Sequence, residues 1–392
     1  MHTLEVVSLA LLSLSAFLAA CALHPFVTYP ISLALFATRR VKAATGSTDR
    51  LSVAICMSAY NEEAVIVDKV RSLIAAAEAY GNATVHIYTD GCSDRTEELL
   101  RPFADRIDLI VSHHRCGKTH GMNLLLERST SALVMFADAN VVSDDRIISQ
   151  LATPFGDPTV GCTTARLLYS NSDESATSLA GSIYWAMEES IKQIESSTVG
   201  VIGVDGASFM IRRSLYCSAP DDLIDDLFVT LCVLATGAQV VRVAEAVVYE
   251  RSAVKAEEEY RRKVRIACQA VRVHRQLWPM IRTLPTLQVY AYISHRLIKW
   301  LVPFLVAGSL IAITASFTML FGWWALASSL AALFAVLIGG LANVPGFSFV
   351  YTVGFSLFGV AHGVLQGFFS RNTFTTWDPV ASVRTPPPQE VL

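Results

Sequence analysis

The sequence predicts an α/β domain, built on a mostly parallel sheet, between membrane helices at its two ends. Two observations predict this class. Residues 6–38 and 301–370 lack any charged side chain, and strand and helix signals alternate over residues 50–285. Charged residues make up 17% of the chain, against about 25% in soluble proteins. The net charge of −3 gives no indication of nucleic-acid binding.

Residues 1–40 are expected to form an N-terminal transmembrane segment. About 20 apolar residues cross a bilayer, and this segment is too long for the apolar region of a signal peptide. Pro25 and Pro30 predict the end of the spanning helix or a kink in it. Arg39, Arg40 and Lys42 follow, and the positive-inside rule then places the next residues in the cytoplasm.

The second uncharged segment, 301–370, is expected to hold the C-terminal transmembrane helices. Breaks in it predict three spans, at 301–320, 323–342 and 347–369. Residues 286–300 mix aromatic and basic side chains, which is typical of a helix in the membrane interface. Three full spans would leave the tail, residues 371–392, outside, whereas one re-entrant segment would return it to the inside.

Residues 41–285 are expected to form a cytosolic domain. Apolar, β-rich runs alternate with helical stretches, which predicts a mostly parallel sheet covered by helices. The predicted strands are Leu51–Met57, Thr84–Thr89, Ile107–Ser112 and Ala132–Ala137. The chain has eight cysteines, none spaced as C-x-x-C, which favours a reducing, intracellular environment. Ligands of such sheets bind beyond the carboxyl ends of the strands.

Polar residues follow three of these strands. They are Tyr60, Asn61 and Glu62 after the first strand, Asp90 after the second, and Asp138 and Asn140 after the fourth. Asp90-Gly91 is also a common turn pair. Asp138 ends an apolar strand, where an unpaired carboxylate is costly to bury. Asp138 and Asn140 offer hard oxygen ligands on one side of an extended chain, suited to Mg²⁺ or Mn²⁺ on a diphosphate.

No glycine-rich phosphate loop of the G-x-x-x-x-G-K-[ST] or G-x-G-x-x-G type occurs. A nucleotide would therefore be held by carboxylates on its base and ribose and by a metal on its phosphates.

Seven short motifs follow one another in a fixed order. They are A-Y-N-E-E at 59–63, T-D-G-C-S-D-R-T at 89–96, R-C-G-K at 115–118, A-D-A-N at 137–140, G-V-D-G-A-S-F-M-I-R-R at 203–213, D-D at 225–226 and R-R-K-V-R-I at 261–266. With this ordered set the chain resembles the membrane-integrated branch of the family 2 glycosyltransferases, which includes cellulose, hyaluronan and poly-N-acetylglucosamine synthases and some glycolipid transferases. The resemblance implies a Rossmann-like GT-A fold and a catalytic domain on the cytosolic face of the plasma (inner) membrane.

The resemblance also implies a role for each matching position. For the donor, these are Tyr60, Asn61, Glu62 and Asp90 at the uracil and ribose of a UDP-sugar, Lys118 at its phosphates, and Asp138 with Asn140 at the metal. For the reaction, they are Asp226 as general base, beside Asp225, and Arg265 at the diphosphate. For the acceptor, they are Gly206, Ala207, Arg262 and Ile266.

The chemistry of sugar transfer agrees with these roles, because inverting transfer needs one base and charge stabilisation on the leaving group. Alternatives remain for two segments. Asp225 and Asp226 could mark an exposed helix start, where the dipole favours acidic residues. Residues 257–265 could form a solvated helix with paired charges or bind anionic lipids.

Two departures from the family pattern bear on the product. Asn140 stands where the metal motif has a second Asp, while Arg262 and Ile266 replace the Gln and Trp of Q-x-x-R-W. The second change favours a short product, a lipid acceptor or a divergent polymerase subgroup. Residues 374–384 are similar to tail motifs that some of these synthases place near the cytosolic mouth of the site.

The main hypothesis is an inverting, metal-dependent transferase that moves a sugar from a UDP-sugar to a growing polysaccharide or lipid-linked acceptor. One alternative is an enzyme that adds a single sugar to a lipid, such as polyprenyl phosphate, diacylglycerol or ceramide. An alternative of another class is a catalytically silent membrane subunit that binds nucleotide-sugar or polysaccharide.

Overall fold

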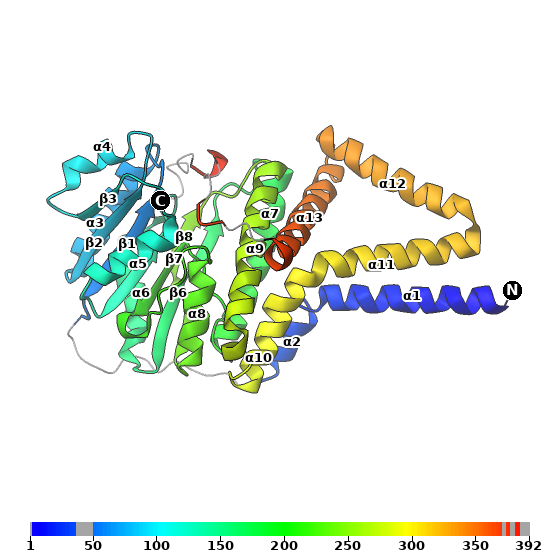
Figure 1. Cartoon of the computed structure of the whole chain (residues 1–392), viewed down its shortest axis with the longest axis horizontal. Coiled ribbons are helices and arrows are strands. Elements are labelled where there is room, and N and C mark those ends of the chain that lie inside the picture. The colour runs from blue at the N-terminus through cyan, green and yellow to red at the C-terminus, as the bar shows by residue number, and fades with distance from the viewer. Residues whose placement is uncertain (1, 37–49, 371–373, 377–380, 385–392) are drawn as a thin grey trace.

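The computed structural model describes residues 2–36, 50–370, 374–376 and 381–384 (Figure 1). Arg39, Arg40 and Lys42, on which the predicted orientation depends, lie outside these residues. An eight-stranded sheet in the order β3-β2-β1-β4-β7-β6-β8-β5 forms the centre of the described domain. Its strands are β1 (Val53–Ala59), β2 (Ala83–Asp90), β3 (Asp108–Ser112), β4 (Leu133–Ala137), β5 (Val142–Ser143), β6 (Val160–Tyr169), β7 (Ser208–Arg212) and β8 (Gln239–Glu250).

The two halves of the sheet differ in strand direction. β1, β2, β3 and β4 are all parallel, as their apolar sequences predict, because strands buried on both faces carry nearly continuous apolar runs. β7 is antiparallel to both β4 and β6, and β8 is parallel to β6. The α/β class is confirmed, and the second half adds a mixed arrangement.

Helices cover both faces of the sheet. They are α3 (Ile66–Tyr80), α4 (Thr96–Leu100), α5 (Lys118–Arg128), α6 (Ile147–Ala152), α7 (Ala176–Ser196), α8 (Asp225–Ala235) and α9 (Ala256–Ile281). α3 shows why they form: Ile66, Val70, Leu73 and Ile74 make a buried stripe at helical spacing. Gly81, at φ +82°, ends α3 in a left-handed turn.

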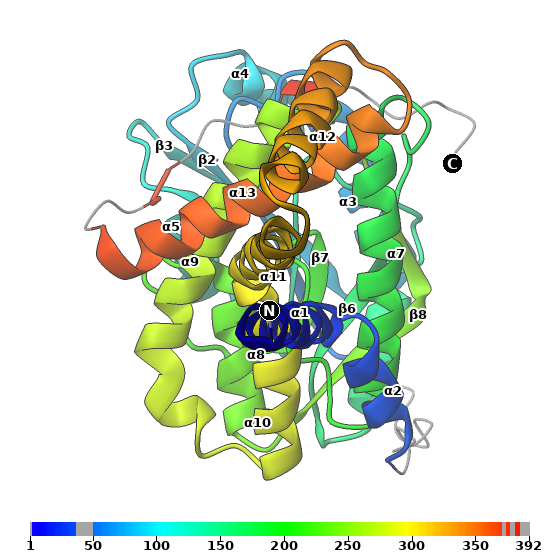
Figure 2. The ribbon, with the colours of Figure 1, turned by 90° about the vertical axis from the view of Figure 1, so that its right-hand side faces the viewer.

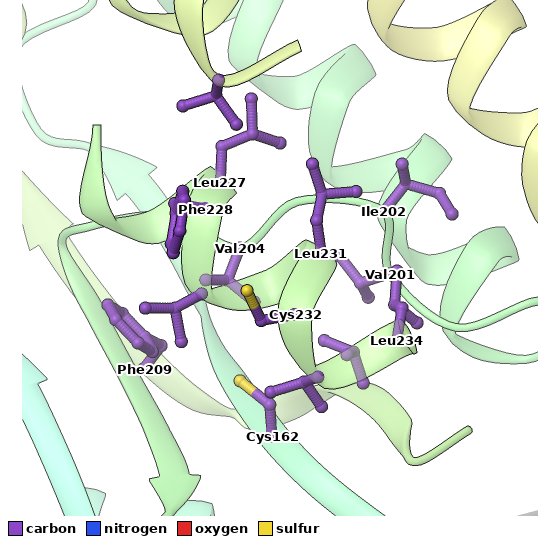
Figure 3. Packing of buried hydrophobic residues seen from close by; sticks show 14 of the residues in the cluster. Cys162, Val201, Ile202, Val204, Phe209, Leu227, Phe228, Leu231, Cys232 and Leu234 are labelled. Carbon is purple, nitrogen blue, oxygen red and sulfur yellow. The ribbon is translucent and has the colours of Figure 1, made fainter. Parts of the chain in front are cut away.

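A buried cluster fixes α8 beneath the edge of the sheet. Figure 3 shows Leu227, Phe228 and Leu231 of α8 beside Val204 and Phe209, all of them buried. Burying a Leu or Phe side chain contributes about 1.5–3 kcal/mol. The first turn of α8 and the segment before β7 are therefore held together by the core.

Within the described residues, four helices are long and apolar enough to cross a membrane: Leu4–Leu23, Thr286–Phe321, Trp323–Leu341 and Phe347–Phe369. The first lies within α1 (His2–Leu23) and the second includes α11 (Ile298–Phe321), and these two helices run side by side away from the sheet (Figures 1 and 2). Ser8 bonds Ser316 at 2.6 Å and Ser15 bonds Ser309 at 3.0 Å. Such small hydroxyl residues allow close helix packing and hydrogen bonding in lipid.

The remaining apolar helices turn back toward the domain. α12 (Trp323–Leu341) returns from the far end of α11, and α13 (Phe347–Phe369) lies along α9 (Figure 1). Gly359, Gly363 and Gly367 face α9 so closely that a Cβ atom at Gly363 would lie 2.3 Å from the carbonyl oxygen of Val264. A row of glycines therefore joins α13 to a helix of the α/β domain.

Two segments connect these helices to the domain. α2 (Thr28–Ala34) follows α1, and α10 (Thr286–Tyr292) leads through a π-helical turn, Ile293–Leu297, into α11. Tyr292 and His295, expected in a membrane interface, are buried within the protein. His295 lies between Glu188 and Glu195 of α7.

Candidate active site

The residues predicted for catalysis meet at the carboxyl end of β4. Lys118, the first residue of α5, places its Nζ 2.7 Å from Asp138 Oδ1 and 3.8 Å from Asp225 Oδ2. Gly206 lies among them: a Cβ atom there would be 3.1 Å from Lys118 Nζ and 3.4 Å from Asp226 Oδ2. A side chain at position 206 would therefore fill the centre of the site.

Asp226 is held by two backbone amides. The Gly206 amide donates to Oδ2 at 3.1 Å, and the Leu227 amide donates to Oδ1 at 2.5 Å. Burial, and then the neighbouring carboxylate of Asp225, raise the pKa of Asp226 to about 7, although Lys118 lowers it. A half-buried carboxylate with this pKa is suited to general base chemistry near neutral pH.

Asp225 is more deeply buried than Asp226. Its Oδ2 atom has no hydrogen-bond partner among the described residues, and Lys118 is its ion-pair neighbour. Burial lowers the pKa of Lys118, but Asp138 and Asp225 together raise it above its ordinary value. Lys118 therefore carries a positive charge between two carboxylates.

Helix α9 brings Arg265 toward the same carboxylates. Burial and Arg262 lower the pKa of Arg265 to about 10, while Asp226, Asp138 and Asp225 act against this shift. Arg262 donates instead to Glu259, at 2.7 and 3.0 Å. Ile266 is half-buried on α9. Of the three predicted α9 residues, Arg265 is thus the one that interacts with all three of these carboxylates.

The carboxylate of Asp90 accepts hydrogen bonds from other residues of the protein. Its buried carboxylate accepts from the amides of Cys116 and Gly117 at 2.7–3.1 Å and from the Tyr88 hydroxyl at 3.2 Å. These bonds hold the loop that leads into Lys118. Asp90 therefore shapes the site through residues 115–118.

The turn after β1 forms the other side of the site. Asn61, at φ +52°, accepts from the Ser93 amide at 2.8 Å. Arg115 stacks over the ring of Tyr60 at 3.6 Å. Burial raises the pKa of Glu62 to about 7, against the lowering effect of Arg384. The turn is thus tied to both neighbouring loops.

Part of the tail lies across this turn. Arg384 donates to the Tyr60 carbonyl at 2.6 Å, to the Asn61 carbonyl, and to Glu62 Oε1 at 2.7 Å. Thr375, earlier in the tail, lies close to Gly117: a Cβ atom added at Gly117 would be 2.2 Å from the Thr375 carbonyl oxygen. The tail motif that ends at Arg384 was noticed in the sequence, but its contact with the turn was not predicted, because nothing local links residues 323 positions apart.

Glu250 is a second residue that sequence reasoning missed. It ends β8, and its Oε1 accepts from the Asn140 amide at 3.0 Å. Burial raises the pKa of Glu250 to about 7, and Asp138 contributes to the rise. Its position at the end of a strand is the sequence feature that could have identified it.

Asp138 and Asn140, which follow β4, were predicted to bind a metal ion. In the described part of the chain, no three His, Cys, Asp or Glu side chains are grouped to bind one. Mg²⁺ in nucleotide sites often takes only one or two carboxylates, the remaining ligands being phosphates and water. Asp138, with Asn140 or Glu250 beside it, fits this mode, in which the ion arrives with the nucleotide.

A comparison with protein families identifies the class. The family model described as "Glycosyltransferase like family 2" matches residues 49–269. The match covers more than half of the chain, and the chain belongs to this family. The predicted family resemblance is confirmed.

Solved structures show the same fold. A mannosyltransferase of Pyrobaculum calidifontis, in complex with GDP-mannose and Mn²⁺, superposes with a TM-score of 0.70 at 18% identity. The alignment covers 92% of this chain and 100% of that one. The predicted GT-A fold is thereby confirmed.

Curated relatives are N-acetylglucosaminyltransferases of rhizobia. Those of Rhizobium sp. (strain N33) and Rhizobium meliloti (strain 1021) are each 25% identical over 215 residues, or 50% of this chain. The matched residues make up 47% and 50% of these relatives. The chain thus spans about half the length of the curated relatives it matches.

Proposed function

We propose that this chain is an inverting membrane glycosyltransferase that moves a sugar from a UDP-sugar to a carbohydrate or lipid-linked acceptor. The observation that carries the proposal is the convergence of Lys118, Asp138 and Asp226 on Gly206. A cation, a candidate metal ligand and a carboxylate with a pKa of about 7 there meet around a space that only glycine leaves open.

In this proposal Asp226 takes the proton of the acceptor hydroxyl. That oxygen attacks the anomeric carbon of the donor, the bond from that carbon to the diphosphate breaks, and the nucleoside diphosphate leaves. Two amides fix the carboxylate of Asp226, so that it needs little reorganisation during the reaction. Lys118 and Arg265 supply positive charge for the leaving diphosphate.

Asp138, with Asn140 or Glu250, would hold a divalent ion on the diphosphate. Such an ion supplies further neutralisation of the leaving group. The Mn²⁺ in the Pyrobaculum calidifontis complex supports this assignment. Tyr60, Asn61, Glu62 and the loop held by Asp90 would contact the base and ribose.

The proposed sugar is N-acetylglucosamine. The curated relatives, matched over 50% of this chain, are N-acetylglucosaminyltransferases. GDP-mannose, bound by the fold neighbour, is the competing donor.

We place the catalytic domain on the cytosolic side of the plasma (inner) membrane, with α1, α11 and α12 crossing the bilayer. α13 would lie against the membrane surface, because it packs along α9. The contact of Arg384 with the turn after β1 agrees with a tail on the same side as the active site.

The test is a nucleotide-release assay with the purified chain in detergent. UDP-N-acetylglucosamine, other UDP-sugars and GDP-mannose are offered with Mg²⁺, with Mn²⁺ and with a chelator. We expect metal-dependent UDP release that the Asp226→Asn variant lacks. Turnover of GDP-mannose alone would refute the proposed donor, and no turnover with any sugar nucleotide would refute the proposed function.

A further inference from the structure

A group of cations lies on the membrane-facing side of the catalytic base. This cationic cluster consists of Arg262 and Lys263 of α9, Arg296 of the π-helical turn Ile293–Leu297, and Lys299 of α11. Tyr184 of α7 lies at its centre: Lys263 Nζ is 4.4 Å and Lys299 Nζ 5.5 Å from the centre of its ring. Figure 2 shows α7 and α9 on opposite sides of α11, with α13 crossing above it.

Glu259 and Glu188 form ion pairs with three of these cations. Glu259 accepts from Arg262 at 2.7 Å and lies 3.4 Å from Lys263, and Glu188 lies 2.8 Å from Lys299. Glu188 is shared further with His295, at 3.3 Å. Glu250 also acts on Arg262, and Glu188, Glu195 and Asp205 act on Arg296, so these cations and carboxylates form one network.

The fourth cation, Arg296, has donor capacity left. It donates from Nη2 to the Gly203 carbonyl at 2.9 Å, but its buried Nε has no hydrogen-bond partner among the described residues. The nearby Glu195 already accepts from Tyr29 and from the Ile202 amide and is bonded to His295. An unused buried donor is costly unless a ligand satisfies it.

The cluster also borders the catalytic base. Arg265, whose charge acts on Asp226, lies on α9 within one turn of Arg262 and Lys263. Arg296 packs on Gly203, three residues before the glycine whose amide binds Asp226. A molecule held by the cluster would therefore lie next to the carboxylate that takes the acceptor proton.

Solvent and lipid can reach the cluster. The side chains of Arg262, Lys263 and Lys299 are 24%, 18% and 13% exposed. Large apolar side chains are exposed on the three helices around it, namely Ile183 and Met187 of α7, Leu301 and Phe304 of α11, and Phe358 of α13. Phe358 stacks on Tyr260, one turn from Lys263, with ring centres 5.9 Å apart. A charged interior thus adjoins an apolar surface.

We propose that the cationic cluster binds the phosphate group of an amphiphilic acceptor, whose apolar chain stays in the bilayer and whose hydroxyl reaches Asp226. This inference rests on the proposed function and selects, among carbohydrate and lipid acceptors, a phosphate-bearing lipid. Charge-assisted bonds from guanidinium and ammonium groups are the usual means of holding phosphate. Burial lowers the pKa of Lys263, Glu259 acts against this shift, and Arg262 lowers the pKa further.

The first experiment uses lipids of the source membrane, separated on an anion exchanger into neutral and anionic fractions. Each fraction is mixed into phosphatidylcholine vesicles with the full chain and a radiolabelled donor. We expect label in a product that remains anionic, formed with the anionic fraction alone. Label in a neutral lipid would overturn the inference, as would label transferred only to soluble saccharide. Neither of these results would touch the proposed function, which fails only if no donor is turned over.

The second experiment tests the residues. Lys263→Met and Lys299→Met should each raise the KM for the anionic acceptor about tenfold. Lys263→Arg should restore it, and Lys255→Met, an exposed lysine of the same region, should leave it unchanged. Nucleotide release without acceptor and vesicle flotation should match the wild type. An unchanged KM, or a loss that follows weaker vesicle binding, would overturn the inference.

A third experiment distinguishes the phosphate of a lipid from that of a soluble ester. Glycerol 3-phosphate in solution is added to the reaction with the anionic fraction. We expect weak competition, because it lacks the apolar chain. Competition as strong as that of the lipid would assign the cluster to a soluble phosphate ester and overturn the amphiphilic acceptor.

Discussion

The donor side and the membrane side of the active site are assembled in different ways. On the donor side, Asp90, Asp138 and the turn after β1 come directly from the ends of neighbouring parallel strands. On the membrane side, α7, α9 and α11 contribute residues from distant parts of the chain. Strand ends meet because of the sheet, whereas the membrane side depends on how helices pack.

The largest expected effect falls on Asp226, which lies between the two sides. Asp226→Asn should lower kcat by about 10²–10⁴, because the acceptor hydroxyl loses its base. The measurement is UDP release with acceptor present, together with thermal unfolding in detergent to show that folding is retained. Asp221→Asn, an exposed carboxylate before α8, is the matched control. Equal rates in the two variants would remove Asp226 from the mechanism.

On the membrane side, Gly363→Ala should destabilise the protein by about 1–3 kcal/mol. The new Cβ would lie 2.3 Å from the Val264 carbonyl oxygen and push α13 away from α9. Thermal unfolding in detergent measures the change. Gly354→Ala, on the same helix, meets nothing within 4 Å and should be neutral. If both variants unfolded at the same temperature, close packing of α13 on α9 would be disproved.

The next variant, Arg384→Ala, removes the contact between the tail and the turn after β1. We expect the KM for the donor to rise about fivefold to tenfold, with a smaller change in kcat, because the turn loses its charged hydrogen bonds. Steady-state kinetics and nucleotide titration measure this. Arg213→Ala, an exposed arginine, serves as control. A lower KM would instead mean that the tail competes with the donor.

The smallest effect concerns pH. Asp226, with a pKa of about 7, must be deprotonated to act as base, so kcat/KM should fall below about pH 7 and level off above it. Asp225 helps to raise this pKa, and Asp225→Asn should therefore move the acid limb to lower pH, by about one unit or less. If the acid limb stays in place or moves to higher pH, the ionisation that causes it does not belong to the Asp225–Asp226 pair.

The comparison also explains what the sequence could predict. Asp138 and Lys118 were found because each follows a recognisable strand or begins a helix, and the sheet brings such positions together. Glu250 was missed although it also ends a strand. Arg262 was predicted for the acceptor, but the grouping of the cationic cluster and the contacts of Arg384 were not predicted, because their partners lie far away in the chain. Asp226 was predicted from motif order, and its two amide bonds and its contact with Gly206 depend on the buried cluster beneath α8.

The placement of the membrane helices was open for a similar reason. Hydropathy predicted three C-terminal spans whose limits agree with α11, α12 and α13 within a few residues. It could not distinguish a helix that crosses the bilayer from one that packs on the domain. The glycines of α13 were visible in the sequence, but their partner carbonyls on α9 were not.

The glycine row of α13 has a consequence for the order of assembly. A ribosome makes α9 roughly a hundred residues before Gly359, Gly363 and Gly367, so the sheet and its carboxylates can fold first. Until those glycines arrive, the face of α9 that they cover stays open, and Arg384 follows later still. The contact of Arg384 with the turn after β1 therefore forms later than the sheet itself.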